Sequence, residues 1–314
     1  MRGTSATRAG AATALAITVF TLLACLTGCA DRDNARPSVV VTTNILGDIT
    51  RRIVGDQADV LVLMKADADP HSFGISASQA ARIERADLVV YNGLGLEENV
   101  LRHVRAAADS GVATIAVAEA VDPIPYATDE SAGALDPHFW TDPHRVSKAA
   151  RLIAERVVDK VEGVDRTAVR ANVAGYGKEI DDLAVWMKER FAQIPEHKRN
   201  LVTNHHVFGY LAQRFGFRVI GAIIPSGTTL AAPSAKDLKS LATAIREADV
   251  GAIFADSSQP ERLANVLREE SGLRVAVVAL FSESLTEKGK GAATYLEMMR
   301  TNTDAIADAL RGRT

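Results

Sequence analysis

A long run of helical periodicity near the middle of the chain constrains the fold most. Between residues 166 and 194, apolar side chains recur at steps of three and four, which places them on one face of an α-helix. The apolar positions are Val169, Val173, Tyr176, Ile180, Leu183, Met187, Phe191 and Ile194. Pro195 cannot continue a helix, so the helix ends before it. At ~1.5 Å per residue such a helix spans about 40 Å, the width of a small domain, and we expect it to link two lobes.

Two blocks of alternating strand and helix patterns flank this linker helix, an N-terminal lobe at residues 38–165 and a C-terminal lobe at residues 195–314. Strands are expected at 39–43, 60–63, 88–91, 114–117, 201–203, 218–224, 252–254 and 275–280, and helices at 45–54, 76–86, 97–108, 142–161, 208–215, 234–248, 259–271 and 290–310. Strands separated by helices favour parallel sheets. The predicted fold is therefore α/β, with two lobes, each a mostly parallel sheet flanked by helices, joined by one long rigid linker helix.

The N-terminus has the pattern of an export signal. Arg2 and Arg8 provide positive charge, and residues 11–24 form an apolar run too short to span a bilayer in the usual way. The run leads to the sequence LTGC ending at Cys29, which resembles the bacterial lipobox, where the cysteine is lipidated and becomes the first mature residue. An ordinary signal peptide cleaved nearby is the alternative.

If Cys29 is lipidated, residues 1–28 are a lipoprotein signal peptide that is removed, and Cys25 is lost with it. Residues 29–37 then form a polar tether that holds the folded part near the membrane. We expect an extracytoplasmic protein that is anchored to the bacterial cell membrane by its lipid.

Charge and cysteine content narrow the partners and the chemistry. The net charge is −3 at pH 7 and no basic stripe is present, so nucleic acid is not expected as a partner. Both cysteines lie within the first thirty residues. The remainder of the chain therefore has neither a disulfide framework nor a cysteine-based zinc site, and any metal site must use histidine and carboxylate ligands.

The tripeptide Asp-Pro-His occurs three times, ending at His71, His138 and His144. The first copy follows a predicted strand, at the sheet edge where open α/β sheets bind ligands, and the second ends an irregular loop. In both, the proline fixes the backbone beside the histidine, as a preorganised ligand requires. Taken singly, each could instead be a surface residue. In the third copy, the Asp and Pro have a sufficient role in starting a helix, so we assign His144 to its first turn.

Further metal-ligand candidates follow the linker helix. His205 and His206 lie between a predicted strand and a predicted helix, and Glu283 follows the last strand. Imidazole and carboxylate ligands together suit Zn²⁺ and are tolerated by Mn²⁺. Each could also be a helix cap or a surface residue. His103, on a charged helix, and His197, in a polar turn, are expected to be solvated.

Several motifs in this order resemble one family. They are the first strand at 39, DPHSF at 69–73, YNGLGLE at 91–97, DPHFW at 136–140, HHVFGYL at 205–211 and TYLEMM at 294–299. The chain resembles the solute-binding proteins of zinc and manganese ABC transporters, the metal-binding lipoprotein family of periplasmic binding proteins. The resemblance covers nearly the whole mature chain and implies two α/β lobes joined by one long helix.

The resemblance implies the metal ligands His71, His138, His205 and Glu283. His205 is chosen over His206 because the family's third ligand lies three residues before the phenylalanine that is Phe208 here. Family members commonly have Asp as the fourth ligand, so Glu283 is a departure, and Asp256 is the alternative ligand or a neighbouring support. Many zinc-binding members also have a histidine-rich loop near residues 121–135, whereas this loop contains acids and no histidine.

The expected function is capture of Zn²⁺, with Mn²⁺ as the alternative, between the lobes, and delivery to an ABC permease with a separate ATPase subunit. Four protein ligands close a tetrahedral zinc site, and no His-Glu-x-x-His, Gly-x-Ser-x-Gly or P-loop motif is present, so we expect a binding protein and not an enzyme. We also expect it to be a monomer. An exported zinc-dependent hydrolase and a surface adhesin or structural lipoprotein are the rival hypotheses.

Overall fold

The computed structural model describes residues 36–126, 132–259, 262–272 and 275–312. The predicted signal peptide (1–28) and the lipidation of Cys29 lie outside these residues, as do residues 127–131 of the histidine-poor loop. Among the helices that are described, none is both long enough and apolar enough to cross a membrane.

The N-terminal sheet contains four parallel strands in the order β2-β1-β3-β4. The strands are β1 (Ser38–Val41), β2 (Asp59–Val62), β3 (Leu88–Tyr91) and β4 (Ala113–Ala116), and the helices around them are α2 (Asn44–Val54), α3 (Ala77–Ile83), α4 (Glu98–Asp109) and α5 (Pro143–Lys160). The central strand β1 is rich in valine, and its residues from Val39 onward are buried, as expected for a strand covered on both faces. Asp142 caps α5 with a proline in the first position, as predicted.

The C-terminal sheet repeats this arrangement, with four parallel strands in the order β6-β5-β7-β8. Its strands are β5 (Asn200–Thr203), β6 (Arg218–Ala222), β7 (Ala252–Asp256) and β8 (Ala276–Leu280), and its helices are α7 (Gly209–Phe215), α8 (Ala235–Glu247), α9 (Arg262–Ser271) and α10 (Tyr295–Leu310). The expected helix start at 290 is wrong. Gly291 has a positive φ, and Thr294 caps the helix by accepting a hydrogen bond from Glu297 N, so α10 begins at Tyr295.

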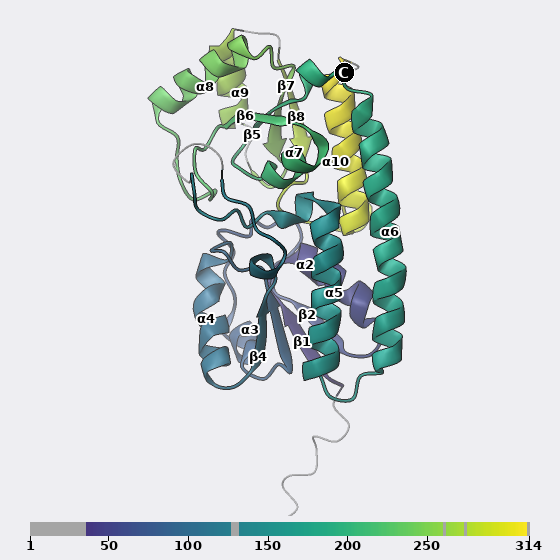
Figure 1. Ribbon diagram of the computed structural model, residues 1–314. Coiled ribbons are helices and arrows are strands. Elements are labelled where there is room, and N and C mark those ends of the chain that lie inside the picture. The colour runs from purple at the N-terminus through teal and green to yellow at the C-terminus, as the bar shows by residue number, and fades with distance from the viewer. Residues whose placement is uncertain (1–35, 127–131, 260–261, 273–274, 313–314) are drawn as a thin grey trace, which may run out of the picture. The chain divides into compact units, whose positions relative to one another are not determined.

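The linker helix is α6 (Arg166–Ala192), which ends two residues before the predicted position. It begins where the Asp165 side chain accepts hydrogen bonds from the amides of Thr167 and Ala168. Most of the predicted apolar stripe is buried, although Val173 is only half-buried. Helix α6 packs against α2 and α5 beside the N-terminal sheet and against α10 beside the C-terminal sheet (Figure 1).

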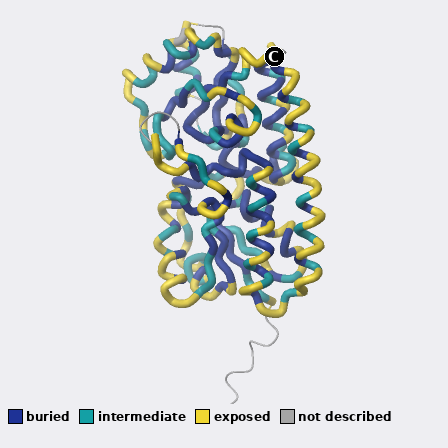
Figure 2. Tube along the Cα trace, in the orientation of Figure 1, coloured by how far each residue is buried: buried dark blue, intermediate teal, exposed yellow. Residues whose placement is uncertain are grey.

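One hydrophobic core runs through both lobes. The largest buried cluster includes Val39 of β1, Tyr176 of α6 and Tyr295 of α10, so the linker helix is part of the core and not an exposed rod. The region of the molecule between the two sheets also consists largely of buried residues (Figure 2). The two-lobed α/β fold is therefore confirmed, while the boundaries at 38–165 and 195–314 stay a prediction.

Candidate metal centre

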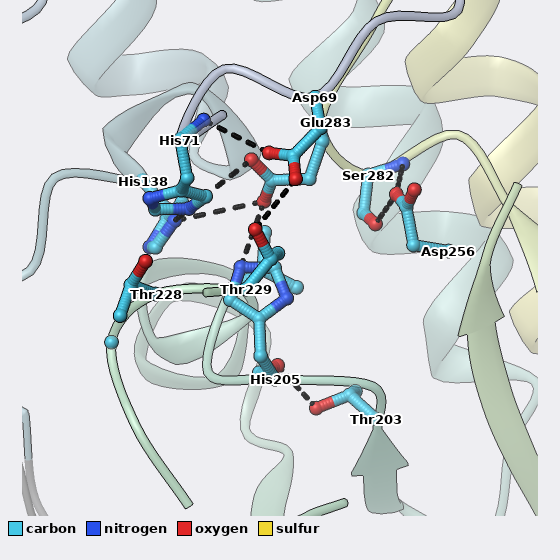
Figure 3. Close-up of polar contacts among 12 residues, drawn as sticks. Asp69, His71, His138, Thr203, His205, Thr228, Thr229, Asp256, Ser282 and Glu283 are labelled. Atoms are coloured by element: carbon cyan, nitrogen blue, oxygen red, sulfur yellow. Dashed lines mark hydrogen bonds and ion pairs between the residues drawn. The ribbon is translucent and has the colours of Figure 1, made fainter. Parts of the chain in front are cut away.

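Four chemically suitable side chains from distant parts of the chain converge at one point (Figure 3). His71 lies in the loop after β2, His205 follows β5, and Glu283 follows β8. His138 directly precedes the short 3₁₀ helix η2 (Phe139–Thr141). One ligand atom from each residue lies within 4.8 Å of the other three. We call His71, His138, His205 and Glu283 the ligand cluster.

The ligand cluster has the dimensions of a single-ion site. The Glu283 carboxylate is central: Oε1 lies 3.2 Å from His205 Nε2 and 3.6 Å from His138 Nε2, and Oε2 lies 3.7 Å from His71 Nε2. The Nε2 atoms of His71 and His138 are 3.4 Å apart. All four residues are at most 1% exposed.

Several polar atoms of the cluster are buried without a hydrogen-bond partner among the described residues. They are Nδ1 of His71, both ring nitrogens of His205, and both carboxylate oxygens of Glu283. Leaving such atoms without hydrogen bonds lowers the stability of the fold, so their concentration at one point indicates that a bound ion or molecule satisfies them. Imidazole nitrogens and a carboxylate oxygen are donors that fit a divalent transition-metal ion.

Two histidines of the cluster have pKa values shifted in opposite directions. Burial and the neighbouring His138 and His205 lower the pKa of His71 to about 2, so His71 is neutral. Burial also opposes the charged form of His205, but the carboxylates of Glu283, Asp256 and Asp69 outweigh it and raise the pKa of His205. The carboxylates therefore favour the protonated form of His205 more than the environment of His71 favours a proton there.

His138 is oriented by Asp136. One carboxylate oxygen of Asp136 accepts hydrogen bonds from the backbone amide of His138 at 2.9 Å and from its ring Nδ1 at 2.7 Å. A hydrogen-bonded carboxylate behind a metal-binding imidazole fixes the ring and directs its other nitrogen to the ion. A side chain at Gly209 would come within 2.9 Å of Asp136 Oδ2, which explains a glycine there. Tyr126 adds its hydroxyl 3.4 Å from His138 Nδ1.

Glu283 is held by contacts on both sides of it. Asp256 accepts hydrogen bonds from the amide and hydroxyl of Ser282, and the Ser282 carbonyl accepts one from Trp140 Nε1 at 2.9 Å. Beyond Glu283, Asn44 pairs with the backbone of Leu285, with its Oδ1 2.9 Å from the Leu285 amide. Asp256 therefore lies outside the ligand cluster and supports the turn that presents Glu283.

The histidines that the sequence did not favour as ligands lie elsewhere. His206 is buried, but its ring faces Tyr126, 6.0 Å between centroids, and it is not in the cluster. His144 and His197 are exposed. His103 was expected to be solvated but is half-buried, and the Arg102 side chain donates a hydrogen bond to it.

Apart from Asp256, which the sequence offered as a neighbouring support, sequence reasoning did not identify the residues that support the cluster. Tyr126 falls in a segment predicted only as a loop, and Trp140 was noted only as part of a motif. Asn44 had one usable signal, since it follows the first strand at the same edge of the sheet as His71. The side-chain partners of the others are distant in the chain, so nothing local indicates them.

Comparisons with known proteins cover nearly the whole chain. The family model described as zinc-uptake complex component A, periplasmic (ZnuA) matches residues 39–309. The metal ABC transporter substrate-binding lipoprotein FimA of Streptococcus parasanguinis is 28% identical over 299 residues, covering 93% of this chain and 95% of FimA. The manganese ABC transporter substrate-binding lipoprotein PsaA of Streptococcus anginosus is 28% identical over 302 residues, covering 94% and 96%.

A solved structure extends the similarity to the fold. The periplasmic zinc-binding protein TroA from Treponema pallidum superposes with a TM-score of 0.79 at 28% sequence identity, over 88% of this chain and 99% of that chain. The span that the family model matches contains the linker helix and nearly all of both lobes.

Proposed function

The chain belongs to the family of zinc-uptake complex component A, periplasmic, and on that premise we propose that it is the extracytoplasmic solute-binding protein of a metal ABC transporter, with Zn²⁺ as its cargo. The observation that carries the proposal is the buried convergence of three imidazoles and one carboxylate from both lobes. The family consists of binding proteins and not of enzymes.

We assign His71, His138, His205 and Glu283 as the metal ligands. Four protein donors match the tetrahedral coordination of a closed zinc site and leave no position for an activated water. Three nitrogen donors favour Zn²⁺ over Mn²⁺, which prefers oxygen ligands. Mn²⁺ is the alternative cargo, since PsaA is named for manganese and TroA for zinc.

The partners follow from this role. We propose that a cognate permease receives the ion and that a separate ATPase subunit drives transport. Lipidation of Cys29 would keep the protein, as a monomer, at the outer face of the cell membrane near that permease. Because α6 packs against both lobes, release of the ion is expected to need a loop movement or a small tilt of one lobe, not a wide hinge. A large compaction on metal addition in solution scattering would contradict this.

The first experiment is elemental analysis of the mature protein purified without added metal, followed by competition between Zn²⁺ and Mn²⁺. We expect one tightly held zinc per chain that Mn²⁺ does not displace. The variant Glu283→Gln should lose that zinc, whereas Glu287→Gln, an exposed neighbour, should keep it. Preferential binding of Mn²⁺ would reassign the cargo, and the absence of any bound metal in the wild type would overturn the site.

A further inference from the structure

The loop between β6 and α8, residues 223–234, crosses from the C-terminal lobe to the ligand cluster. Thr229 Oγ1 donates a hydrogen bond to Asp69 Oδ2 at 2.6 Å, joining this loop to the loop that bears His71 (Figure 3). Gln259, which follows β7, donates to the same oxygen at 3.0 Å. One carboxylate oxygen of the N-terminal lobe thus binds two segments of the C-terminal lobe.

The other oxygen of Asp69 acts within its own loop. Asp69 Oδ1 accepts the backbone amide of His71 at 2.9 Å, which fixes the turn that presents this ligand. The His71 ring has no hydrogen bond at Nδ1 among the described residues, so its orientation depends on this turn and on packing. Asp69 therefore connects the position of a ligand to the position of the opposite lobe.

The contacts that hold the β6–α8 loop differ from those at Glu283. Beside Glu283, Asn44 bonds the Leu285 amide at 2.9 Å and Ser284 Oγ at 2.8 Å, and the Asp67 amide donates to the Leu285 carbonyl at 3.0 Å. Ser284 and Leu285 are buried there, whereas the β6–α8 loop is largely half-buried or exposed from residue 225 onward. Buried hydrogen bonds therefore hold the chain on the Glu283 side of the cluster. On the Thr229 side, the loop is more exposed and a few polar contacts hold it.

We propose that Asp69 is a positioning residue that, through Thr229 and Gln259, closes the β6–α8 loop over the ligand cluster and sets the lifetime of the bound metal. This inference rests on the proposed function, because it concerns the ion held by the cluster. Separation of Thr229 from Asp69 opens the exit of the ion, while the His71 turn keeps its bond to Asp69 Oδ1 and Glu283 keeps its support from Asn44, Trp140 and Asp256.

The test compares zinc release from the wild type and from two matched variants. Thr229→Val preserves the shape of the side chain but removes the hydroxyl that bonds across the lobes. Ser72→Ala removes a hydroxyl that donates to the same Asp69 oxygen, at 3.2 Å, from within the His71 loop. Zinc-loaded protein is mixed with excess chelator in a stopped-flow instrument, and the release rate and association rate are measured separately.

For Thr229→Val we expect release about tenfold faster, the size expected for one lost hydrogen bond to a charged group. The association rate and the stoichiometry of one zinc should stay the same, because all four ligands remain. Thr229→Ser, which keeps a hydroxyl, should restore slow release, and Ser72→Ala should release zinc as the wild type does. Gln259→Leu should also accelerate release, which provides a second variant if Thr229→Val folds poorly.

Two results would overturn the inference while leaving the proposed function intact. One is an unchanged release rate in both Thr229→Val and Gln259→Leu. The other is equal acceleration by Ser72→Ala, which would make Asp69 a local support of its own loop and not a connection between lobes. A wild-type protein that binds no zinc would instead overturn the proposed function, and the inference with it.

Discussion

The three Asp-Pro-His copies form the same local turn but serve different purposes. In each copy an Asp side-chain oxygen accepts the backbone amide of the His two residues later, at 2.9 Å. His71 and His138 point into the buried ligand cluster, whereas His144 is exposed at the start of α5. The local sequence therefore sets the turn, and the position of that turn in the fold decides whether its histidine joins the ligand cluster.

The three aspartates differ in what else they bind. Asp136 bonds the ring of its own histidine, Asp69 bonds Thr229 and Gln259 of the opposite lobe, and Asp142 forms ion pairs with arginines. The same side chain thus orients a ligand, connects two lobes, or stabilises a helix start. The direct partners of each aspartate side chain distinguish these roles.

The largest expected effect separates the first two copies from the third. His71→Ala and His138→Ala should each weaken zinc binding by more than about 100-fold. Loss of a residue that only supports a metal ligand costs about 10–100-fold, and loss of the ligand itself costs more. His144→Ala, in the third copy, should bind zinc as the wild type does. Competition titration with a chelator of known affinity measures all three. Weakened binding in His144→Ala, or normal binding in His71→Ala, would refute the distinction.

A smaller effect is expected from the aspartate that orients a ring. Asp136→Asn should weaken zinc binding by about 10–100-fold, because the His138 ring loses its charged partner while all four ligands remain. Asp159→Asn changes an exposed carboxylate and is the control. The same titration applies, with thermal unfolding of the metal-free proteins to confirm folding. Equal affinities of Asp136→Asn and the control would mean that packing alone orients His138.

The smallest expected effect is the change in zinc affinity per pH unit. It distinguishes His205 from His71, because their pKa values shift in opposite directions. The pKa of His205 is raised, so lowering the pH places a proton where the metal must bind, and affinity should fall about tenfold per pH unit below that pKa. The pKa of His71 is about 2, so His71 adds no competing proton between pH 7 and pH 5. Zinc titrations at pH 7, 6 and 5 measure the slope. An affinity at pH 5 equal to that at pH 7 would exclude a histidine-based site.

Much of the fold was predictable because the elements have local signals. The valine-rich strands and the apolar stripe of α6 gave bounds within a few residues, and Asp142-Pro143 gave the start of α5. The predicted start of α10 was wrong because the helical pattern in the sequence continues through Gly291, whose positive φ interrupts the helix. The equal strand order of the two sheets was not predictable, since strand pairing joins residues distant in the chain.

By itself the sequence determined the two-lobed fold class, because helix periodicity and strand composition are local properties. It also marked His71, His138, His205, His206 and Glu283 as candidates, and the resemblance to the metal-binding lipoprotein family implied the choice of four among them. The tertiary structure places His205 and not His206 in the cluster, as the resemblance implied, and places Asp256 behind Glu283 as a support. Only the tertiary structure decided that Asp69 meets Thr229 and that Trp140 meets Ser282. Those contacts depend on where parallel strands end side by side and which loops then meet. Such proximity arises from packing of the whole chain and leaves no trace in the spacing of neighbouring residues.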